Sequence, residues 1–170
     1  SEIFLLTGDK GIVYYFRDIE HSMEVIQDEN TSMLFQQESF NGAIFGGNDS
    51  GIVKFVDGKF VEVAHLPATV WALSEDDDVL WVGTEEGLAV YDGDSVQFVE
   101  RGPVCPINAI EKAVDPDYLW LGTNQGFDYF NKVDETTEFS IDYQTGLPGN
   151  EIVIEDRKST RLNSSHFVPS

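Results

Sequence analysis

Cysteine and basic residues are scarce in this 170-residue chain. Cys105 is its single cysteine, so no disulfide can form within the chain, which leaves its redox compartment open. Ten lysines and arginines stand against 31 aspartates and glutamates, for a formal net charge of −21. Because phosphate-rich partners are bound by clustered basic side chains, this balance argues against nucleic acid and against an anionic membrane surface as partners.

Long apolar runs are also missing. No stretch of 18 apolar residues occurs, and residues 1–4 lack the basic start and the apolar run of a secretory signal. We therefore expect this chain to meet a membrane only through segments that it does not contain.

Histidine and cysteine, which are common in catalytic and zinc sites, are few. His21 and His65 have no serine, cysteine or carboxylate at a recognised catalytic spacing, and we interpret both as loop or packing residues. Cys105 lies in a turn with Arg101 as its nearest basic neighbour, which favours a packing thiol over a nucleophile. The D-x-[DN]-x-[DN]-G loop of calcium sites is absent. We expect no catalytic residue, no metal site and no cofactor.

What the chain does contain is a repeated pair of short apolar segments. Residues 80–91 (LWVGTEEGLAVY) return almost unchanged at 119–130 (LWLGTNQGFDYF). Residues 44–55 are the same unit with Phe45 for the tryptophan, and residues 4–15 are a degraded copy. The glycines that close the turns, 40, 36 and 39 residues apart, are Gly11, Gly51, Gly87 and Gly126. A period of this length carried by strand pairs is typical of β-propeller blades.

The sequence therefore predicts an all-β chain, a β-propeller fragment of about four four-stranded antiparallel blades within residues 1–155. The predicted blades cover roughly residues 2–28, 32–64, 69–100 and 107–143, with the start of another at 151–155. In the second blade we expect the first strand at 32–36 and a two-residue hairpin at Asp57 and Gly58.

Two residue pairs at fixed repeat positions are predicted to shape the core. Trp81 and Trp120 share one position, and we expect both indoles to pack between blades. Gly83 and Gly122 stand in mid-strand, where glycine indicates a bulge or a close backbone approach. Trp71, on a predicted inner strand, is left open between core packing and sugar stacking.

A turn in residues 139–152 (FSIDYQTGLPGNEI) suits a crossing between blades. Gly146 permits a left-handed or extended bend, Pro148 fixes φ, and Asn150 can bond local backbone. The crossing would lead from the outer strand of one blade to the inner strand of the next.

The segments 77–88 and 117–126, together with this turn, resemble the two-component regulator propeller repeat. The resemblance is strongest over residues 65–155, with Gly149 where serine is usual. It implies the periplasmic or extracytoplasmic sensor of a bacterial hybrid histidine kinase, which binds a small molecule or a glycan fragment without catalysis. The alternatives are a propeller scaffold for protein–protein interaction in the cell envelope and, third, a propeller glycan lyase or hydrolase.

Polar residues at the blade ends are the candidate ligand contacts, because turns gather on one face and their polar groups are not needed for packing. These are Asn48, Asp49, Glu85, Glu86, Arg101, Asn108, Asn124 and Gln125. The alternative interpretation is that they are solvated turn residues.

Residues 156–166 (DRKSTRLNSSH) resemble the translation of a common DNA-sequencing adapter. We therefore treat residues 156–170 as an artefactual tail without fixed structure. We expect the protein to continue past Glu155, and its further blades to be packing partners of this chain.

Overall fold

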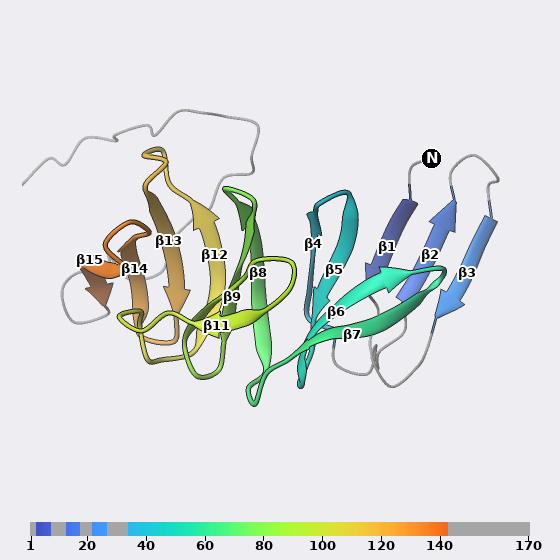
Figure 1. Cartoon of the computed structure of the whole chain (residues 1–170), viewed down its shortest axis with the longest axis horizontal. Helices are drawn as coiled ribbons and strands as arrows, with labels where there is room; N and C mark the ends of the chain where they lie inside the picture. The colour runs from blue at the N-terminus through green and yellow to red at the C-terminus, as the bar shows by residue number, and fades with distance from the viewer. Residues whose placement is uncertain (1–2, 8–12, 18–21, 27–33, 143–170) are drawn as a thin grey trace, which may run out of the picture.

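The chain is described by a computed structural model over residues 3–7, 13–17, 22–26 and 34–142. These residues form fifteen strands and no helix, arranged as four antiparallel sheets that lie side by side in chain order (Figure 1). The chain is thus an all-β propeller segment, as the repeat predicts. Gly146, Pro148, the strand expected at 151–155 and the tail at 156–170 lie outside the described residues.

In each sheet, neighbouring strands are consecutive in the chain. The first has three strands, β1 (Ile3–Thr7), β2 (Val13–Arg17) and β3 (Ser22–Ile26). The second comprises β4 (Gln36–Phe40), β5 (Ala43–Gly47), β6 (Gly51–Val56) and β7 (Lys59–His65). The third comprises β8 (Val70–Asp76), β9 (Val79–Thr84), β10 (Leu88–Tyr91) and β11 (Val96–Phe98). The fourth comprises β12 (Ile107–Lys112), β13 (Tyr118–Thr123), β14 (Gly126–Asn131) and β15 (Thr136–Asp142). We call β4, β8 and β12 the inner strands.

The hairpins explain one wrong prediction. Asp57 and Gly58 have φ of 50° and 83°, so the predicted two-residue turn is present. Asn41 and Gly42, with φ of 48° and 72°, form a second turn of this kind that the sequence analysis missed. Strand β4 ends at this turn. The first strand of the second sheet therefore covers Gln36–Phe40 and not residues 32–36.

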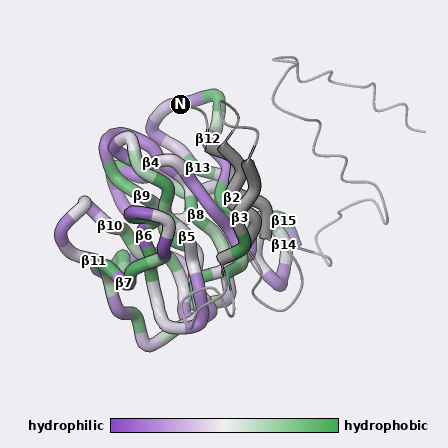
Figure 2. The backbone as a smooth tube through the Cα atoms, turned by 90° about the vertical axis from the view of Figure 1, so that its right-hand side faces the viewer, coloured by the Kyte–Doolittle hydropathy of each residue, from purple (hydrophilic) through white to green (hydrophobic). Residues whose placement is uncertain are grey.

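The core lies between the sheets. Strand β9 is buried on both faces, with Leu80 and Val82 packed toward the second sheet and Trp81 toward the fourth. The Trp81 ring lies 6.0 Å from that of Phe130. Figure 2 shows hydrophilic stretches where the chain turns. Burial on both faces is what the position of a middle strand in a stack of sheets requires.

Glycines let neighbouring sheets approach closely at one repeat position. A Cβ on Gly47 would lie 2.9 Å from Val70 Cβ, at the start of the next inner strand. A Cβ on Gly83 would lie 2.7 Å from the carbonyl oxygen of Ile107, at the start of the inner strand after that. The same contact thus joins the second sheet to the third and the third to the fourth.

The packing of Trp120 between blades stays a prediction, because the fourth sheet is the last one that the structure describes. Trp81 is 7% exposed, whereas Trp120 is only half-buried. Its ring lies 4.6 Å from Tyr129 and 5.8 Å from Phe139, both in its own sheet. Its repeat position matches that of Trp81, but it faces away from the third sheet, and no described sheet covers it. We call Tyr118, Trp120, Tyr129 and Phe139 the end face.

Candidate functional site

In the second, third and fourth sheets, the turns between the second and third strands share one side of the molecule with the crossings at residues 66–69 and 99–106, and we call this side the loop face. Backbone hydrogen bonds join the two kinds of segment. Glu85 N donates to Thr69 O at 2.9 Å, and Leu66 N donates to Ser50 O at 2.9 Å. These hydrogen bonds hold the crossings against the turns. The loop face is therefore one continuous surface and not a set of independent loops.

A threonine builds two of these turns. Thr84 Oγ1 donates to Gly87 O at 2.8 Å and accepts from Glu86 N at 3.1 Å. Thr123 Oγ1 has the same partners one sheet later, donating to Gly126 O at 3.3 Å and accepting from Gln125 N at 3.1 Å. The side chains that follow each threonine, among them Glu85 and Glu86, are left exposed to solvent.

Asn48 takes the place of the threonine in the second sheet. Its side chain is 1% exposed, and its Oδ1 accepts a hydrogen bond from Ser50 N at 3.0 Å. The amide oxygen of Asn48 is therefore used within its own turn, and a ligand contact at this residue stays a prediction. Its neighbour Asp49 is exposed, and Ser50 Oγ lies 3.4 Å from its Oδ1.

A groove of about 440 Å³ opens on the loop face beside the third sheet. Its walls are largely apolar and include Pro67, Phe98 and Val104. Glu86 and Glu100 also line it. Phe98 is 40% exposed and Val104 is 88% exposed, so the groove offers apolar area to a ligand beside carboxylates.

The groove brings together one predicted contact and several missed ones. Glu86 was predicted, and the exposed Arg101 directly follows the groove residue Glu100. The apolar walls were missed, although Phe98 stands out as an aromatic residue in a short outer strand. Exposed Asp49, Asn124 and Gln125 belong to the turns of other sheets and do not line the groove. Ligand contacts at these residues stay predictions.

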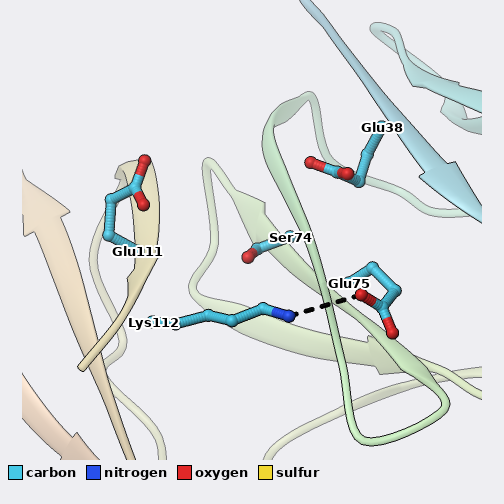
Figure 3. Close-up of a pocket in the computed structure, with 5 residues that line it drawn as sticks. All are labelled: Glu38, Ser74, Glu75, Glu111 and Lys112. Carbon is cyan, nitrogen blue, oxygen red and sulfur yellow. Dashed lines mark hydrogen bonds and ion pairs between the residues drawn. The ribbon is translucent and has the colours of Figure 1, made fainter. Parts of the chain in front are cut away.

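A second hollow, of about 330 Å³, lies between the inner strands (Figure 3). Glu38 of β4, Ser74 and Glu75 of β8, and Lys112 of β12 line it. Lys112 reaches across to the third sheet, where its Nζ lies 3.3 Å from Glu75 Oε2. Its Nζ also lies 3.4 Å from Asp76 Oδ1, so two carboxylates of the third sheet share this lysine.

An ion cluster next to this hollow joins the third and fourth sheets. Lys132 Nζ contacts a carboxylate oxygen of Asp76 and lies 2.6 Å from Asp77 Oδ2, and its side chain is 8% exposed. Burial alone would lower the pKa of Lys132, but its hydrogen bonds to the two carboxylates outweigh burial and raise it. The same hydrogen bond holds the pKa of Asp77 below its usual value. Lys112 and Lys132 each connect the fourth sheet to the third through these carboxylates.

No catalytic constellation stands out among the described residues. His65 is exposed, with Nδ1 3.8 Å from Glu62 Oε1, and burial raises the pKa of the half-buried Cys105 thiol. A raised pKa keeps the thiol protonated, which is unfavourable for a nucleophile. No three His, Cys, Asp or Glu side chains within the described ranges gather as a metal site would require.

No membrane-spanning helix is found either, because the part of the chain that the structure describes has no helix of sufficient length and apolarity.

Comparison with solved structures confirms the propeller architecture. The chain is similar to the extracellular domain described as that of a one-component system from B. thetaiotaomicron, with a TM-score of 0.66, 18% identity and coverage of 78% of this chain and 20% of that one. It is similar to the extracellular domain of a hybrid two-component system from the same organism, with a TM-score of 0.61, 21% identity and coverage of 79% and 21%.

A third similar structure has another role. PorZ, a surface component of the type-IX secretion system of Porphyromonas gingivalis, matches with a TM-score of 0.61 and 9% identity over 86% of this chain and 28% of PorZ. No protein-family model matches the chain, and no curated protein matches its sequence significantly. The chain spans about a fifth to a quarter of these structures' lengths, and at such identities the likeness shows the fold alone.

Proposed function

We propose that this chain is part of a ligand-sensing propeller in an extracytoplasmic receptor for bacterial signal transduction. The observation that carries the proposal is the loop-face groove, an apolar surface of about 440 Å³ with Glu86 and Glu100 at its walls. Such a mixture of apolar area and few polar groups is typical of sites for small ligands. The likeness to extracellular domains of signalling systems supports it.

In this proposal the ligand is a small molecule or a glycan fragment and is bound without being transformed. A ligand can change signalling only if it binds two arrangements of the receptor with different affinities. The crossings between sheets are suitable transmitters because backbone hydrogen bonds tie them to the turns that face the ligand.

The test measures binding by isothermal titration calorimetry with a panel of neutral oligosaccharides and small metabolites, followed by product analysis of the same mixtures. We expect saturable binding, no change in the ligand, and at least a severalfold loss of affinity in Phe98→Ala. Glu138→Gln, an exposed change on β15, serves as the control. Conversion of a glycan would contradict the proposal in favour of an enzyme.

The end face supports further blades as packing partners of this chain. In the third sheet Trp81 is covered by Phe130 of the fourth, whereas Trp120 at the matching position has a partly open ring and Phe139 is 45% exposed. A face of four aromatic side chains is suited to burial against another sheet. The 170-residue chain should therefore self-associate in sedimentation experiments, and Phe139→Ser should reduce the association. A monomer at all concentrations would contradict this.

A scaffold for protein–protein interaction is the second candidate, favoured by the likeness to PorZ over 86% of the chain. It predicts that the loop face binds a folded protein of the envelope and no small ligand. Calorimetry with the panel separates the two, because a scaffold leaves every small ligand unbound.

A further inference from the structure

Three residues at one repeat position do not pack into the core between the sheets. Gln36, Ala72 and Ala109 pair with the glycines at or next to the end of the second strand in the second, third and fourth sheets. The residues directly before them, which we call the inner row, are Phe35, Trp71 and Asn108. They stand at or just before the starts of the inner strands, toward the loop face.

Two members of the row, Trp71 and Asn108, lie at β-bulges. The register of β8 with β9 shifts between Val70 and Ala72, so Trp71 is the extra residue. Val70 packs toward the second sheet and Ala72 toward the fourth, and Trp71 belongs to neither cluster. The register of β12 with β13 shifts in the same way around Asn108. Bulges redirect side chains, and here they turn two out of the sheet faces.

The aromatic members of the row touch each other and remain accessible. The Phe35 and Trp71 rings lie 4.4 Å apart at 50°, Phe35 is 37% exposed and Trp71 is partly exposed. Asn108 is exposed on the neighbouring inner strand. An amide both donates and accepts hydrogen bonds, so the row combines an apolar ring surface with a group that can bond hydroxyls.

The charge of the surroundings narrows the ligand class. The chain carries −21, and Glu85 lies near the start of β8, where its Oε2 is 3.5 Å from Thr69 Oγ1. Farther along the inner strands, Glu38, Glu75 and Glu111 line the hollow beside Lys112. A field of this sign disfavours uronic acids and sulfated sugars.

We propose that the inner row is a subsite for a neutral oligosaccharide. One pyranose stacks the apolar C–H side of its ring on Trp71 and Phe35, and its hydroxyls bond the Asn108 amide. The inference rests on the sensing function proposed above and names its ligand class and contact residues. The site is separate from the loop-face groove, whose walls contain no member of the row.

In the test, NMR records the three tryptophan indole N–H signals while the 170-residue chain is titrated with one probe at a time. The neutral probes are cellohexaose, maltohexaose and mannohexaose. The charged probes are the anionic hexagalacturonate and the cationic tetramethylammonium. The Trp71 signal should shift with a neutral hexasaccharide. The signal of Trp81, whose buried Nε1 finds no partner within the described residues, should not. Trp71→Ala should weaken binding about tenfold and Asn108→Ala severalfold. Trp71→Phe, which keeps a ring, should retain most of the affinity, and Glu138→Gln serves as the control.

The outcomes separate this inference from the proposed function. Glycan binding that survives Trp71→Ala and Asn108→Ala but is lost in Phe98→Ala overturns the inner row and leaves sensing at the groove intact. A preference for hexagalacturonate or tetramethylammonium overturns the neutral-sugar class. No binding of any probe by the folded chain overturns the inference, and the sensing proposal then depends on the metabolite panel.

Discussion

The approach of one sheet to the next at Gly83 yields the sharpest prediction about this fold. In Gly83→Ala the new Cβ would lie 2.7 Å from the Ile107 carbonyl oxygen, 2.9 Å from Ile107 Cγ2 and 3.1 Å from Ala72 Cβ. Ordinary contacts of a Cβ begin near 3.4 Å. Because the closest neighbour is a backbone atom of β12, the fourth sheet must move away from the third to relieve the contact.

The magnitude follows from two opposing effects. Overpacking of this kind costs about 1–3 kcal/mol. Replacing glycine by alanine lowers the entropy of the unfolded chain and recovers about 0.4–1 kcal/mol. We expect a net loss of about 1–2 kcal/mol in the free energy of unfolding, and each kcal/mol corresponds to roughly 2–4 °C in Tm for a chain of this size.

Gly122→Ala is the matched control, since Gly122 occupies the same repeat position one sheet later. Its Cβ would lie 3.2 Å from Ala109 Cβ and at least 3.7 Å from the other two nearest atoms, all in its own sheet. We expect a change within about 0.5 kcal/mol or a slight stabilisation. Urea unfolding followed by circular dichroism measures both variants. Equal losses, or a stabilised Gly83→Ala, would refute the account of sheet contact given above.

Three further predictions concern contacts between sheets. Lys132→Met should lower the free energy of unfolding by about 1–3 kcal/mol, because it leaves the partly buried Asp76 carboxylate without its nearest cation. Asp77→Asn should flatten the acid side of the stability profile: the lowered pKa of Asp77 gives stability that is present above its ordinary value of 3.8 and lost as the pH falls through the folded value. Gln36→Ala should cost roughly 1–2 kcal/mol, since its amide donates to Leu73 O at 3.1 Å and accepts from Leu73 N at 3.2 Å.

Matched variants accompany Asp77→Asn and Gln36→Ala. Asp78→Asn removes one negative charge from the same β8–β9 turn as Asp77, and an equal flattening of its acid profile would mean that net charge, not the Lys132 contact, sets the slope. Gln37→Ala shortens the next side chain of β4, and a loss as large as that of Gln36→Ala would argue against the amide contact. Chemical unfolding in urea at low salt reports all of them.

The repeat made the strands around residues 79–91 and 118–131 predictable, because each strand pair combines apolar residues on both faces with a turn that needs glycine. Gly87 and Gly126, with φ of 136° and 149°, show why. The late start of β4 was not predicted because the turn at Asn41 and Gly42 was overlooked beside the stronger repeat signal.

The candidate sites were harder to predict than the strands. The walls of the groove come from a crossing (Pro67), an outer strand (Phe98) and the next crossing (Val104), and no spacing in the sequence links them. The orientation of Trp71 depends on a register shift of one residue, which hydrophobic alternation does not reveal. The polar turn residues could be placed on one face from the sequence, but the apolar side chains between them could not be predicted.

The inner row and the glycine contacts illustrate how one repeat can carry both packing and binding. Val70 and Ile107 fill the same place against the preceding sheet, and both are fully buried apolar residues because any other choice would separate the sheets. One residue further along the chain, the row changes from the aromatic Trp71 to the polar Asn108 without disturbing either core cluster. Because the residue at this position can be aromatic or polar without a loss of packing, its side chain can contribute to ligand binding. If the neutral-sugar subsite is correct, altering the row should change ligand affinity and leave the free energy of unfolding nearly unchanged, whereas altering the glycine contacts should do the reverse.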